Sequence, residues 1–503
     1  MLPYDEIAKR AYHTNGTNND FVEDAMQDIE QMVKEAQAFV EDVWEDVVAD
    51  IDYLVQVDSV EDKGRAADGM PFGPGPHEAL TRALAVADRL GLATTDHEGY
   101  IGFGDLVGKA SRYVATVAHA DIVPVGEGWD TDPLRVTRRD GYLLGRGVLD
   151  DKGPLVLSLY AAHFFVRRQA AMGERLPLTL RCIVGCNEET GMEDVEHYLR
   201  HYPQPEFCFT PDACFPLICG EKGHATARVC SAPVQASEAR VVRLEGGTVS
   251  NAVAGQASAL VRCVTPPSPC DGITVETVEE GRLYRLHAQG VGGHASTPEG
   301  TQNAIGMLVR YVLERGLCDA EERAFLEFER DLLSDAYGAG IGLATRDEAF
   351  GRLTCVGGTV CTEERDGWLR MYQTIDMRYP TSVTGDELRA RVETLAKGHG
   401  CRMVDWDDAA PFYQSPDDAE VRALVDTYNL VRGCDEGPIT IGGGTYARHF
   451  AKAVAFGPDD PSCPAPGWVG QEHGPNEGVS EAELRRALVI YIVGIARLMD
   501  ILA

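Results

Sequence analysis

The sequence predicts an α/β protein with two kinds of domain. One domain has a mainly parallel sheet flanked by helices, and it is interrupted by an inserted α+β domain. A chain of 503 residues is too long for a single ordinary core. Short apolar runs alternate with helix-compatible segments in the first part of the chain, which is typical of a parallel sheet. The composition changes after residue 218, so we expect the first domain at 1–219 and 411–503 and the insertion at 220–410.

The first ninety residues predict mostly helix. Residues 1–20 are expected to form a loose polar arm. From residue 20 to residue 57, apolar side chains recur every three or four positions, which predicts one long or two short amphipathic helices. A loop that contains Pro71, Pro74 and Pro76 follows, and the next helix is expected over residues 77–90.

Three short, β-rich runs then predict neighbouring strands, and each run leads to a residue with metal-binding chemistry. Residues 113–118 lead into His119, residues 178–185 into Glu188, and residues 207–210 into Asp212. Ligands of open α/β sheets gather beyond the carboxyl ends of the strands, so one crevice could collect all three side chains. Asp121 lies two positions after His119 and points to the same side of an extended chain.

The rest of the chain carries further predicted elements. In the insertion, strands are expected at 225–230, 239–244, 257–265, 283–289 and 368–377, and helices at 303–315, 321–334 and 385–397. None of them contains an acid or His cluster dense enough for a metal. The last part predicts a helix at 418–431, a glycine-rich turn at 442–448, a strand at 453–456 and a helix at 480–502. Ser480 is the expected N-cap of that final helix.

Composition excludes several classes of function. The net charge is −33, from 46 basic and 79 acidic residues, which disfavours binding to nucleic acid or to an anionic membrane. No apolar run is long enough to span a membrane, and the N-terminus lacks the features of a secretory signal. The 14 cysteines form no C-x-x-C pair and lie mostly in apolar runs, which indicates reduced core thiols. We therefore expect a cytoplasmic protein.

One set of residues has the composition of a two-metal hydrolytic site. Such a site needs a bridging carboxylate, terminal ligands for each ion and a general base. We expect the following roles: His119 and Asp212 on one ion, Glu189 and His473 on the other, Asp150 as the bridge, Glu188 as the base and Asp121 as the acceptor that orients His119. Imidazole and carboxylate ligands together favour zinc, with manganese or cobalt as alternatives. His473 comes late in the chain, so it must return to the first domain.

Each motif also has an ordinary structural explanation. A single His-x-Asp is usually a chance pair on a surface, and Asp-Asp-Lys-Gly alone could be a helix cap and turn. The occurrence of all the motifs together, after apolar runs, favours the metal site. The glycines at 442–444 could cradle a phosphate, but they lack the Lys-Ser/Thr ending of a P-loop. We interpret them as backbone that approaches a substrate.

Several segments resemble one enzyme family in order and spacing. They are AHADIVPVGEGW, GRGVLDDKGP, GCNEETG, TPDACFP, GEKG, IGGGTYAR and HGPNE. From about residue 20 onward the chain resembles the di-zinc dipeptidases of the PepV and Sapep kind, in a group that includes carnosinases, aminoacylases and DapE-type desuccinylases. Two departures are Ala118, where the family often has glycine, and Gly474-Pro475, where it has larger polar residues. The second departure bears on the geometry around His473.

The resemblance implies a catalytic domain interrupted by a lid, together with substrate contacts that the residues alone do not reveal. In the family, lid residues that correspond to Asn251, His294 and Arg378 contact the substrate. His294 would stabilise the oxyanion, so closure of the lid would assemble the site. Arg378 and Asn251, with backbone N–H groups around Gly444 and Thr445, would hold the substrate's terminal carboxylate.

The resemblance therefore predicts a dipeptidase that cleaves short peptides with a free C-terminus. The two ions would make hydroxide available at neutral pH, and Glu188 would accept its proton during attack on the carbonyl. Two alternatives remain open, a deacylase of N-acyl amino acids and a non-catalytic metal-dependent binding protein. The expected partner is a small peptide, and we expect a monomer, with a dimer as the alternative.

Overall fold

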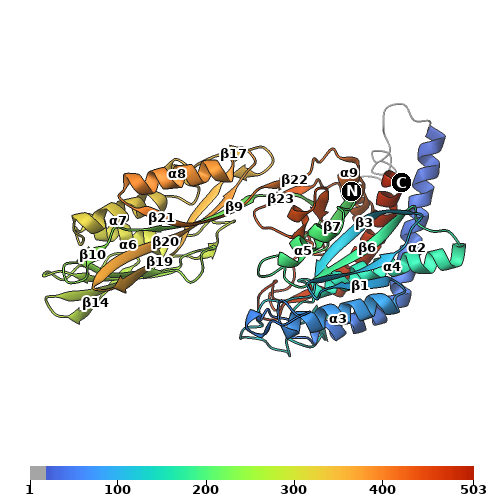
Figure 1. Ribbon diagram of the computed structural model, residues 1–503, viewed down its shortest axis with the longest axis horizontal. Coiled ribbons are helices and arrows are strands. Elements are labelled where there is room, and N and C mark those ends of the chain that lie inside the picture. The colour runs from blue at the N-terminus through green and yellow to red at the C-terminus, as the bar shows by residue number, and fades with distance from the viewer. Residues whose placement is uncertain (1–18) are drawn as a thin grey trace. The chain divides into compact units, whose positions relative to one another are not determined.

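The computed structural model describes residues 19–503, with side chains from residue 27 onward. Residues 1–18, which make up most of the predicted loose arm, lie outside the described residues. The chain divides into two compact units (Figure 1). The first contains the chain up to Cys219 and residues 413–439 and 444–503; the second contains residues 220–412 and 440–443. The predicted boundaries place residues 440–443 in the first domain, whereas these residues group with the second unit.

A nine-stranded sheet forms the centre of the first unit, in the order β1-β2-β6-β3-β7-β24-β8-β22, with β23 paired to β8. The strands β6, β3, β7 and β24 run parallel, while β1, β2 and β8 pair antiparallel. The strand bounds are β1 Ala93–His97, β2 Ile101–Leu106, β3 Ala110–His119, β6 Leu178–Gly185, β7 Phe207–Thr210, β8 Ile218–Glu221, β22 Phe412–Tyr413, β23 Ile439–Ile441 and β24 Ala453–Ala455.

Helices flank this sheet. Their bounds are α2 Asn19–Val55, η1 Lys63–Arg65, α3 Pro74–Arg89, α4 Lys152–Met172, α5 Glu193–His201, α9 Ala419–Arg432, η3 Tyr446–His449 and α10 Glu481–Leu502. The helices α4 and α10 pack on β3 and on α2, and α3 packs on β1 and β2. Buried positions recur every three or four residues along α2, at Ala36, Val40, Val47 and Ile51, so one long helix forms instead of two.

A small three-stranded sheet in the first unit joins two distant parts of the chain. Its strands are β4 Thr137–Arg139, β5 Tyr142–Leu144 and β25 Gly478–Ser480. Gly478 pairs with Leu144, so the segment that follows His473 lies beside the segment that leads to Asp150. This pairing brings the late histidine back to the first unit, as the sequence required.

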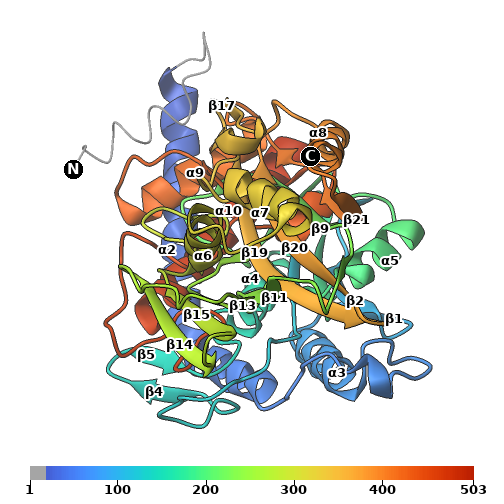
Figure 2. The same ribbon diagram turned by 90° about the vertical axis from the view of Figure 1, so that its left-hand side faces the viewer.

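The second unit is an antiparallel nine-stranded sheet in the order β14-β15-β13-β11-β19-β20-β9-β21, with β10 paired to β20. Figure 2 shows α6 and α7 lying over this sheet, and α8 packs on β9 and β21. The bounds are β9 Gly223–Cys230, β10 Val234–Gln235, β11 Val241–Gly246, β12 Ala252–Val253, β13 Gln256–Arg262, β14 Ile273–Glu279, β15 Leu283–Gln289, β16 Gly293–His294, α6 Ala304–Glu314, α7 Ala320–Leu332, η2 Ala339–Ile341, β17 Arg346–Asp347, β18 Gly351–Arg352, β19 Thr354–Arg365, β20 Trp368–Tyr379, α8 Gly385–Gly398 and β21 Arg402–Ala409.

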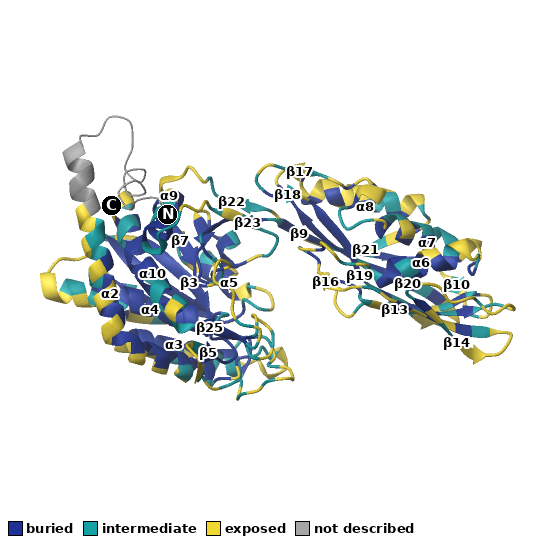
Figure 3. Cartoon of the chain, turned by 180° about the vertical axis from the view of Figure 1, so that it is seen from behind, coloured by how far each residue is buried: buried dark blue, intermediate teal, exposed yellow. Residues whose placement is uncertain are grey.

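The predicted fold class, an α/β domain with a mainly parallel sheet and an inserted α+β domain, is confirmed. In each unit the central strands are buried while loops and outer helix faces are exposed (Figure 3). The helix α3 begins earlier than predicted, at Pro74, because the first turn of a helix does not need the N–H that proline lacks. Among residues 19–503 we find no helix that is both long enough and apolar enough to cross a membrane.

Candidate metal centre

The parallel strands of the first unit end where the candidate ligands begin. His119 is the last residue of β3, and Asp212 follows β7 by two positions. Glu188 and Glu189 lie in the loop between β6 and α5, and Asp150 lies two positions before α4. The carboxyl ends of parallel strands meet at one edge of a sheet, so the fold gathers these side chains at that edge.

Asp150 lies between two imidazoles. Its Oδ1 is 3.0 Å from Nε2 of His119, and its Oδ2 is 2.9 Å from Nε2 of His473. Each imidazole also has a second carboxylate nearby: Asp212 Oδ2 is 3.6 Å from His119 Nε2, and Glu189 Oε2 is 3.1 Å from His473 Nε2. The result is two imidazole–carboxylate pairs that share one central carboxylate.

The carboxylates of this cluster are crowded and partly buried. Burial raises the pKa of Glu188, Glu189 and Asp212, and the charges of neighbouring carboxylates raise it further. Burial acts in the same direction on Asp150, but hydrogen bonds from His119 and His473 outweigh it and lower the Asp150 pKa. The same bonds, from Asp150 and Glu189, raise the pKa of His473 to about 11.

This donor set fits divalent cations. Glu189 Oε1 is buried and has no hydrogen-bond partner among the described residues, so one acceptor atom of this residue lacks a donor. His119 with Asp150 and Glu189, and His119 with Glu188 and Asp212, each place one potential ligand atom per residue within 4.8 Å of the others. Partly buried carboxylates at this density need positive charge, which divalent ions supply.

Asp121 holds the segment that carries two of these carboxylates. Its Oδ1 accepts the backbone N–H of Glu188 at 3.2 Å, and its Oδ2 accepts that of Glu189 at 3.1 Å. The nearest acceptor for His119 Nδ1–H is the Asp121 backbone carbonyl at 3.1 Å, with Oδ1 at 3.4 Å. Asp121 therefore orients His119 through its backbone and the Glu188–Glu189 loop through its side chain, and Nε2 of His119 faces Asp150.

Glu477 is a site residue to which sequence reasoning gave no role, although it closes the HGPNE motif. Its Oε1 accepts the backbone N–H groups of Gly147, Leu149 and Asp150 at 2.9, 3.1 and 3.2 Å. Its Oε2 pairs with Arg146, and both side chains are fully buried. Glu477 thus ties the His473 loop to the turn that presents Asp150. The signal in the sequence was the charged residue that ends the motif containing the predicted ligand His473.

A second missed group supports the loop after β6. The Asp194 carboxylate accepts the backbone N–H groups of Cys186 and Asn187 at 2.8 and 3.0 Å, and the Tyr446 hydroxyl donates to it. The Tyr446 ring also meets His119 edge to face. A Cβ at Gly185 would collide with the Tyr446 hydroxyl, so this close approach requires glycine.

The predicted substrate residues are divided between the two units. Gly444 and Thr445 belong to the first unit, where the buried Thr445 side chain accepts the N–H of Ala447 at the start of η3. Asn251 and His294 come together in the second unit, because β12 pairs with β16 and the Asn251 carbonyl accepts the N–H of Ala295. Both side chains are exposed.

Arg378 lies near the end of β20 in the second unit and is almost fully buried. Its Nε and Nη2 donate to the two carboxylate oxygens of Asp376 at 2.9 and 3.2 Å, and its Nη1 donates to the Gly442 carbonyl at 3.0 Å. His224 Nε2 lies 2.8 Å from the same carboxylate. Asp376 and His224 were not predicted, and together they hold the guanidinium in one orientation.

Comparison with known proteins decides the family. Residues 115–495 match the family described as Peptidase family M20/M25/M40, which is well over half of the chain. The chain belongs to this peptidase family. The M20 peptidase is also 30% identical over 468 residues to a Bacillus subtilis (strain 168) protein named "Putative dipeptidase YtjP", an alignment that covers 90% of this chain and 97% of that protein.

Solved structures share the fold of this M20 peptidase. Human carnosine dipeptidase 1 aligns with a TM-score of 0.54 and 15% identity over 93% of this chain and 100% of that one. The dipeptidase Dug1p from Saccharomyces cerevisiae aligns with a TM-score of 0.56 and 12% identity over 93% of this chain and 98% of that one. The resemblance inferred from the motifs is confirmed at the level of the superfamily, and the protein is a dipeptidase-like metallopeptidase, a metal-dependent hydrolase.

Proposed function

We propose that this M20 peptidase is a two-metal dipeptidase that hydrolyses the peptide bond of short peptides with a free C-terminal carboxylate. The observation that carries the proposal is the position of Asp150 between two imidazole–carboxylate pairs. His119 and Asp212 would hold one ion, Glu189 and His473 would hold the other, and Asp150 would contact both. Zinc suits this mixed donor set, with manganese and cobalt as alternatives.

When bound, two divalent ions supply Lewis acidity that acidifies water and polarises a carbonyl group. Glu188 would act as the general base. Burial and the charge of Asp212 raise the pKa of its carboxyl above the usual value, which makes the carboxylate a stronger proton acceptor. Glu188 would take a proton from the attacking water and deliver it to the leaving amine, while Asp121 holds the Glu188 backbone in place.

The tautomer of His294 suits stabilisation of an oxyanion. Its Nδ1 accepts the backbone N–H of Ser296 at 3.2 Å and lies 2.7 Å from the Ser296 hydroxyl. The ring proton is therefore on Nε2, which is a donor. Partial burial of the ring and the nearby Arg378 lower the pKa of His294, so the ring is neutral at neutral pH and keeps a single N–H to offer.

Arg378 is the proposed partner of the substrate carboxylate. A guanidinium has five N–H groups, and within the described part of the chain Arg378 uses three of them on Asp376 and Gly442. Two N–H groups remain for a planar carboxylate. Asn251 adds an exposed amide, and the backbone N–H groups of Gly444 and Thr445 complete the proposed set. Binding of the substrate carboxylate by these groups would require a free C-terminus.

A substrate panel tests the proposal against its rivals. The zinc-reconstituted enzyme should cleave Ala-Ala and β-Ala-His, and it should cleave an amidated dipeptide at least about tenfold less well, because a charge-assisted contact is lost. Preference for N-acetyl amino acids would indicate a deacylase instead. Zinc binding without turnover of any substrate would indicate a binding protein.

One matched pair of variants tests the proposed contact between Arg378 and the substrate carboxylate. Arg378→Ala should raise KM and lower kcat for free dipeptides and remove the discrimination against amidated ones. Arg370→Ala is the control, since Arg370 lies on the same strand and donates to the Ser231 carbonyl. Equal cleavage of free and amidated dipeptides by the unmodified enzyme would refute the proposed contact between Arg378 and the substrate carboxylate.

Location and oligomeric state stay predictions. All 14 cysteines are free thiols, and most of them are buried, which supports a reducing compartment such as the cytoplasm. A monomer remains the expected state, with a dimer as the alternative, and light scattering on the purified protein would distinguish them.

A further inference from the structure

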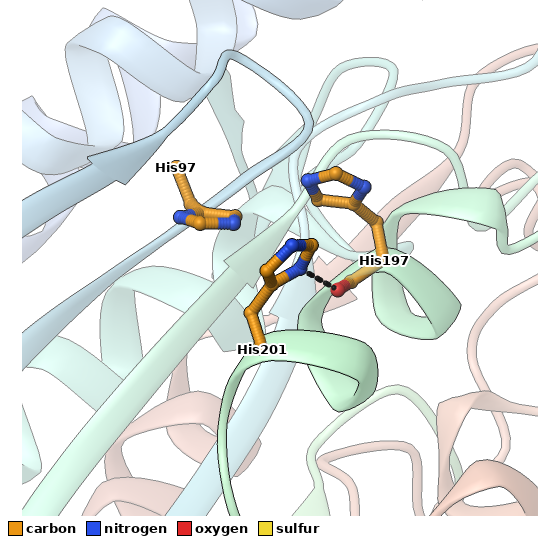
Figure 4. Close-up of side chains that lie close together, drawn as sticks. All are labelled: His97, His197 and His201. Atoms are coloured by element: carbon orange, nitrogen blue, oxygen red, sulfur yellow. Dashed lines mark hydrogen bonds between the residues drawn. The ribbon is translucent and has the colours of Figure 1, made fainter.

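Three histidines of the first unit form a cluster away from the candidate metal centre. His97 ends β1, and His197 and His201 lie one turn apart on α5. Figure 4 shows the three rings facing a common space, with one nitrogen of each ring directed into it. The ring centroids of His97 and His197 are 5.0 Å apart, and the centroid of His201 lies 4.6 Å from each of the other two. One potential ligand atom of each residue lies within 4.8 Å of the others.

We propose that this three-histidine cluster binds one divalent late transition metal ion, such as Zn²⁺, independently of the Asp150 centre. Zinc–nitrogen bonds of 2.0–2.1 Å in tetrahedral geometry place imidazole centroids about 5 Å apart. The rings of the cluster already have this spacing. Binding therefore requires small ring rotations that bring the nitrogens closer, and no rearrangement of the backbone.

The hydrogen bonds of the three rings leave the required nitrogens available. His201 Nδ1–H donates to the His197 carbonyl at 2.8 Å, which leaves Nε2 as the lone-pair nitrogen. His97 Nδ1 lies 3.2 Å from the Tyr202 hydroxyl. The Nε2 atoms of His97 and His197 are buried and have no hydrogen-bond partner among the described residues. Unsatisfied buried nitrogens are uncommon in folded proteins, and a metal ion would satisfy both.

Glu98 offers a fourth ligand. Its Oε2 lies 3.2 Å from His197 Nε2, outside the angles of a hydrogen bond but at the separation of two ligands of one ion. The Glu98 side chain is largely exposed, so it can adjust to an ion without a packing cost. Three imidazoles and one carboxylate form a donor set that late transition metals prefer.

The surroundings of the cluster favour a cation over protonated rings. His197 and His201 lie in the last two turns of α5, where the helix carbonyls carry partial negative charge. Burial and the neighbouring rings of His201 and His97 lower the pKa of His197, so its imidazole is neutral and able to bind metal at neutral pH. Tyr100 stacks on the His197 ring at 4.2 Å and keeps it in position.

A metal at this end of α5 would also stabilise the Glu188–Glu189 loop. Asp194, in the first turn of α5, accepts the backbone N–H groups of Cys186 and Asn187, which directly precede Glu188. An ion that joins β1 to the last turns of α5 would hold this helix against the sheet. Zn²⁺ should therefore raise the unfolding temperature even when the Asp150 centre cannot bind it.

The test uses the full chain with the Asp150 centre disabled by His119→Ala and His473→Ala together, because both groups of potential ligands at that centre contain His119. Zn²⁺ titration should give one ion per chain, and Cu²⁺ should give an electron paramagnetic resonance spectrum with nitrogen hyperfine structure. Adding His201→Gln, at an exposed position, should abolish both signals and the Zn²⁺-dependent rise in unfolding temperature. Adding His97→Gln should do the same.

The control adds His287→Gln, which removes an exposed histidine of β15 and should leave the binding intact. Circular dichroism establishes that each variant is folded. The proposal is overturned if the double variant binds no Zn²⁺, or if binding survives both His201→Gln and His97→Gln. Peptidase activity of the unmodified enzyme is a separate measurement, so failure of this proposal and failure of the dipeptidase proposal are distinguishable.

Discussion

Replacement of Asp121 by asparagine tests how the Glu188–Glu189 loop is held. Each Asp121 carboxylate oxygen accepts one backbone N–H from this loop, and the side chain is almost fully buried. Asparagine has the same shape but only one acceptor oxygen. In either orientation its NH₂ group faces one of the two backbone N–H groups. One buried N–H is therefore left without an acceptor.

The expected size of the effect follows from this loss. A hydrogen bond to a charged acceptor contributes about 1.5–3 kcal/mol, which corresponds to a factor of about 10 to 150 in an equilibrium constant. Replacement of a residue that orients a metal ligand typically lowers metal affinity by about 10- to 100-fold, which agrees with this range. We therefore expect Asp121→Asn to require about 10–100 times more Zn²⁺ for half-maximal activity, because Glu189 is no longer fixed as a ligand.

The assay restores activity to the metal-free enzyme by titration with Zn²⁺ and measures kcat/KM at saturation. Asp105→Asn is the matched control, since Asp105, on β2, is a largely buried carboxylate whose two oxygens accept from Nε and Nη2 of Arg181, on β6. It should lower stability without changing the Zn²⁺ requirement. If Asp121→Asn needs the same Zn²⁺ concentration as the unmodified enzyme and keeps its kcat/KM, the loop is held by other contacts and the reasoning fails.

Three further predictions concern the base, a tight contact and a buried acid. Glu188→Gln should lower kcat by about 10²–10⁴-fold without changing the Zn²⁺ requirement; retention of most of the activity would remove Glu188 as the base. Gly185→Ala should lower the unfolding temperature and the activity together, since its Cβ displaces the Tyr446 hydroxyl; an unchanged thermal melt would contradict this. Burial raises the pKa of Glu329 well above its usual value. The unfolded chain therefore loses this proton more readily than the folded one, and the buried carboxyl destabilises the fold increasingly as the pH rises from about 4.5 through the folded-state pKa. Glu329→Met should therefore raise the unfolding temperature more at pH 8 than at pH 5, whereas Glu321→Met, at the exposed start of the same helix, should show no such difference.

The sequence revealed those parts of the site that follow directly from strand ends. His119, Glu188 and Asp212 each come soon after an apolar run, and the carboxyl ends of parallel strands meet, so their proximity could be predicted. His473 has no such signal, because it lies in a loop with a left-handed backbone, φ +62°. The prediction that His473 joins the metal site depended on the resemblance of the HGPNE motif to the same motif in a known family.

Long-range supporting contacts could not be predicted. Arg146 and Glu477 are 331 positions apart, and only the pairing of β25 with β5 brings them together. The histidine cluster illustrates the same limit, since His197 and His201 show helical spacing but His97 lies a hundred positions earlier. Side chains that meet through tertiary packing leave no periodic pattern in the sequence.

The missed strands have a different cause. The hairpin of β1 and β2 contains the polar run at 93–97 and two glycines, Gly102 and Gly104, which pack closely on Leu84 and Leu92. Polar and glycine-rich segments have low intrinsic strand propensity. They form strands here because β2 pairs with the buried strand β6. Tertiary pairing outweighs local preference at this edge of the sheet.

The most direct test of the central claim is a crystal structure of the zinc-loaded protein with anomalous scattering measured at the zinc absorption edge. Two peaks should flank the Asp150 carboxylate, one beside His119 and Asp212 and the other beside Glu189 and His473. A single peak at this centre, or two ions that do not share Asp150, would contradict the account.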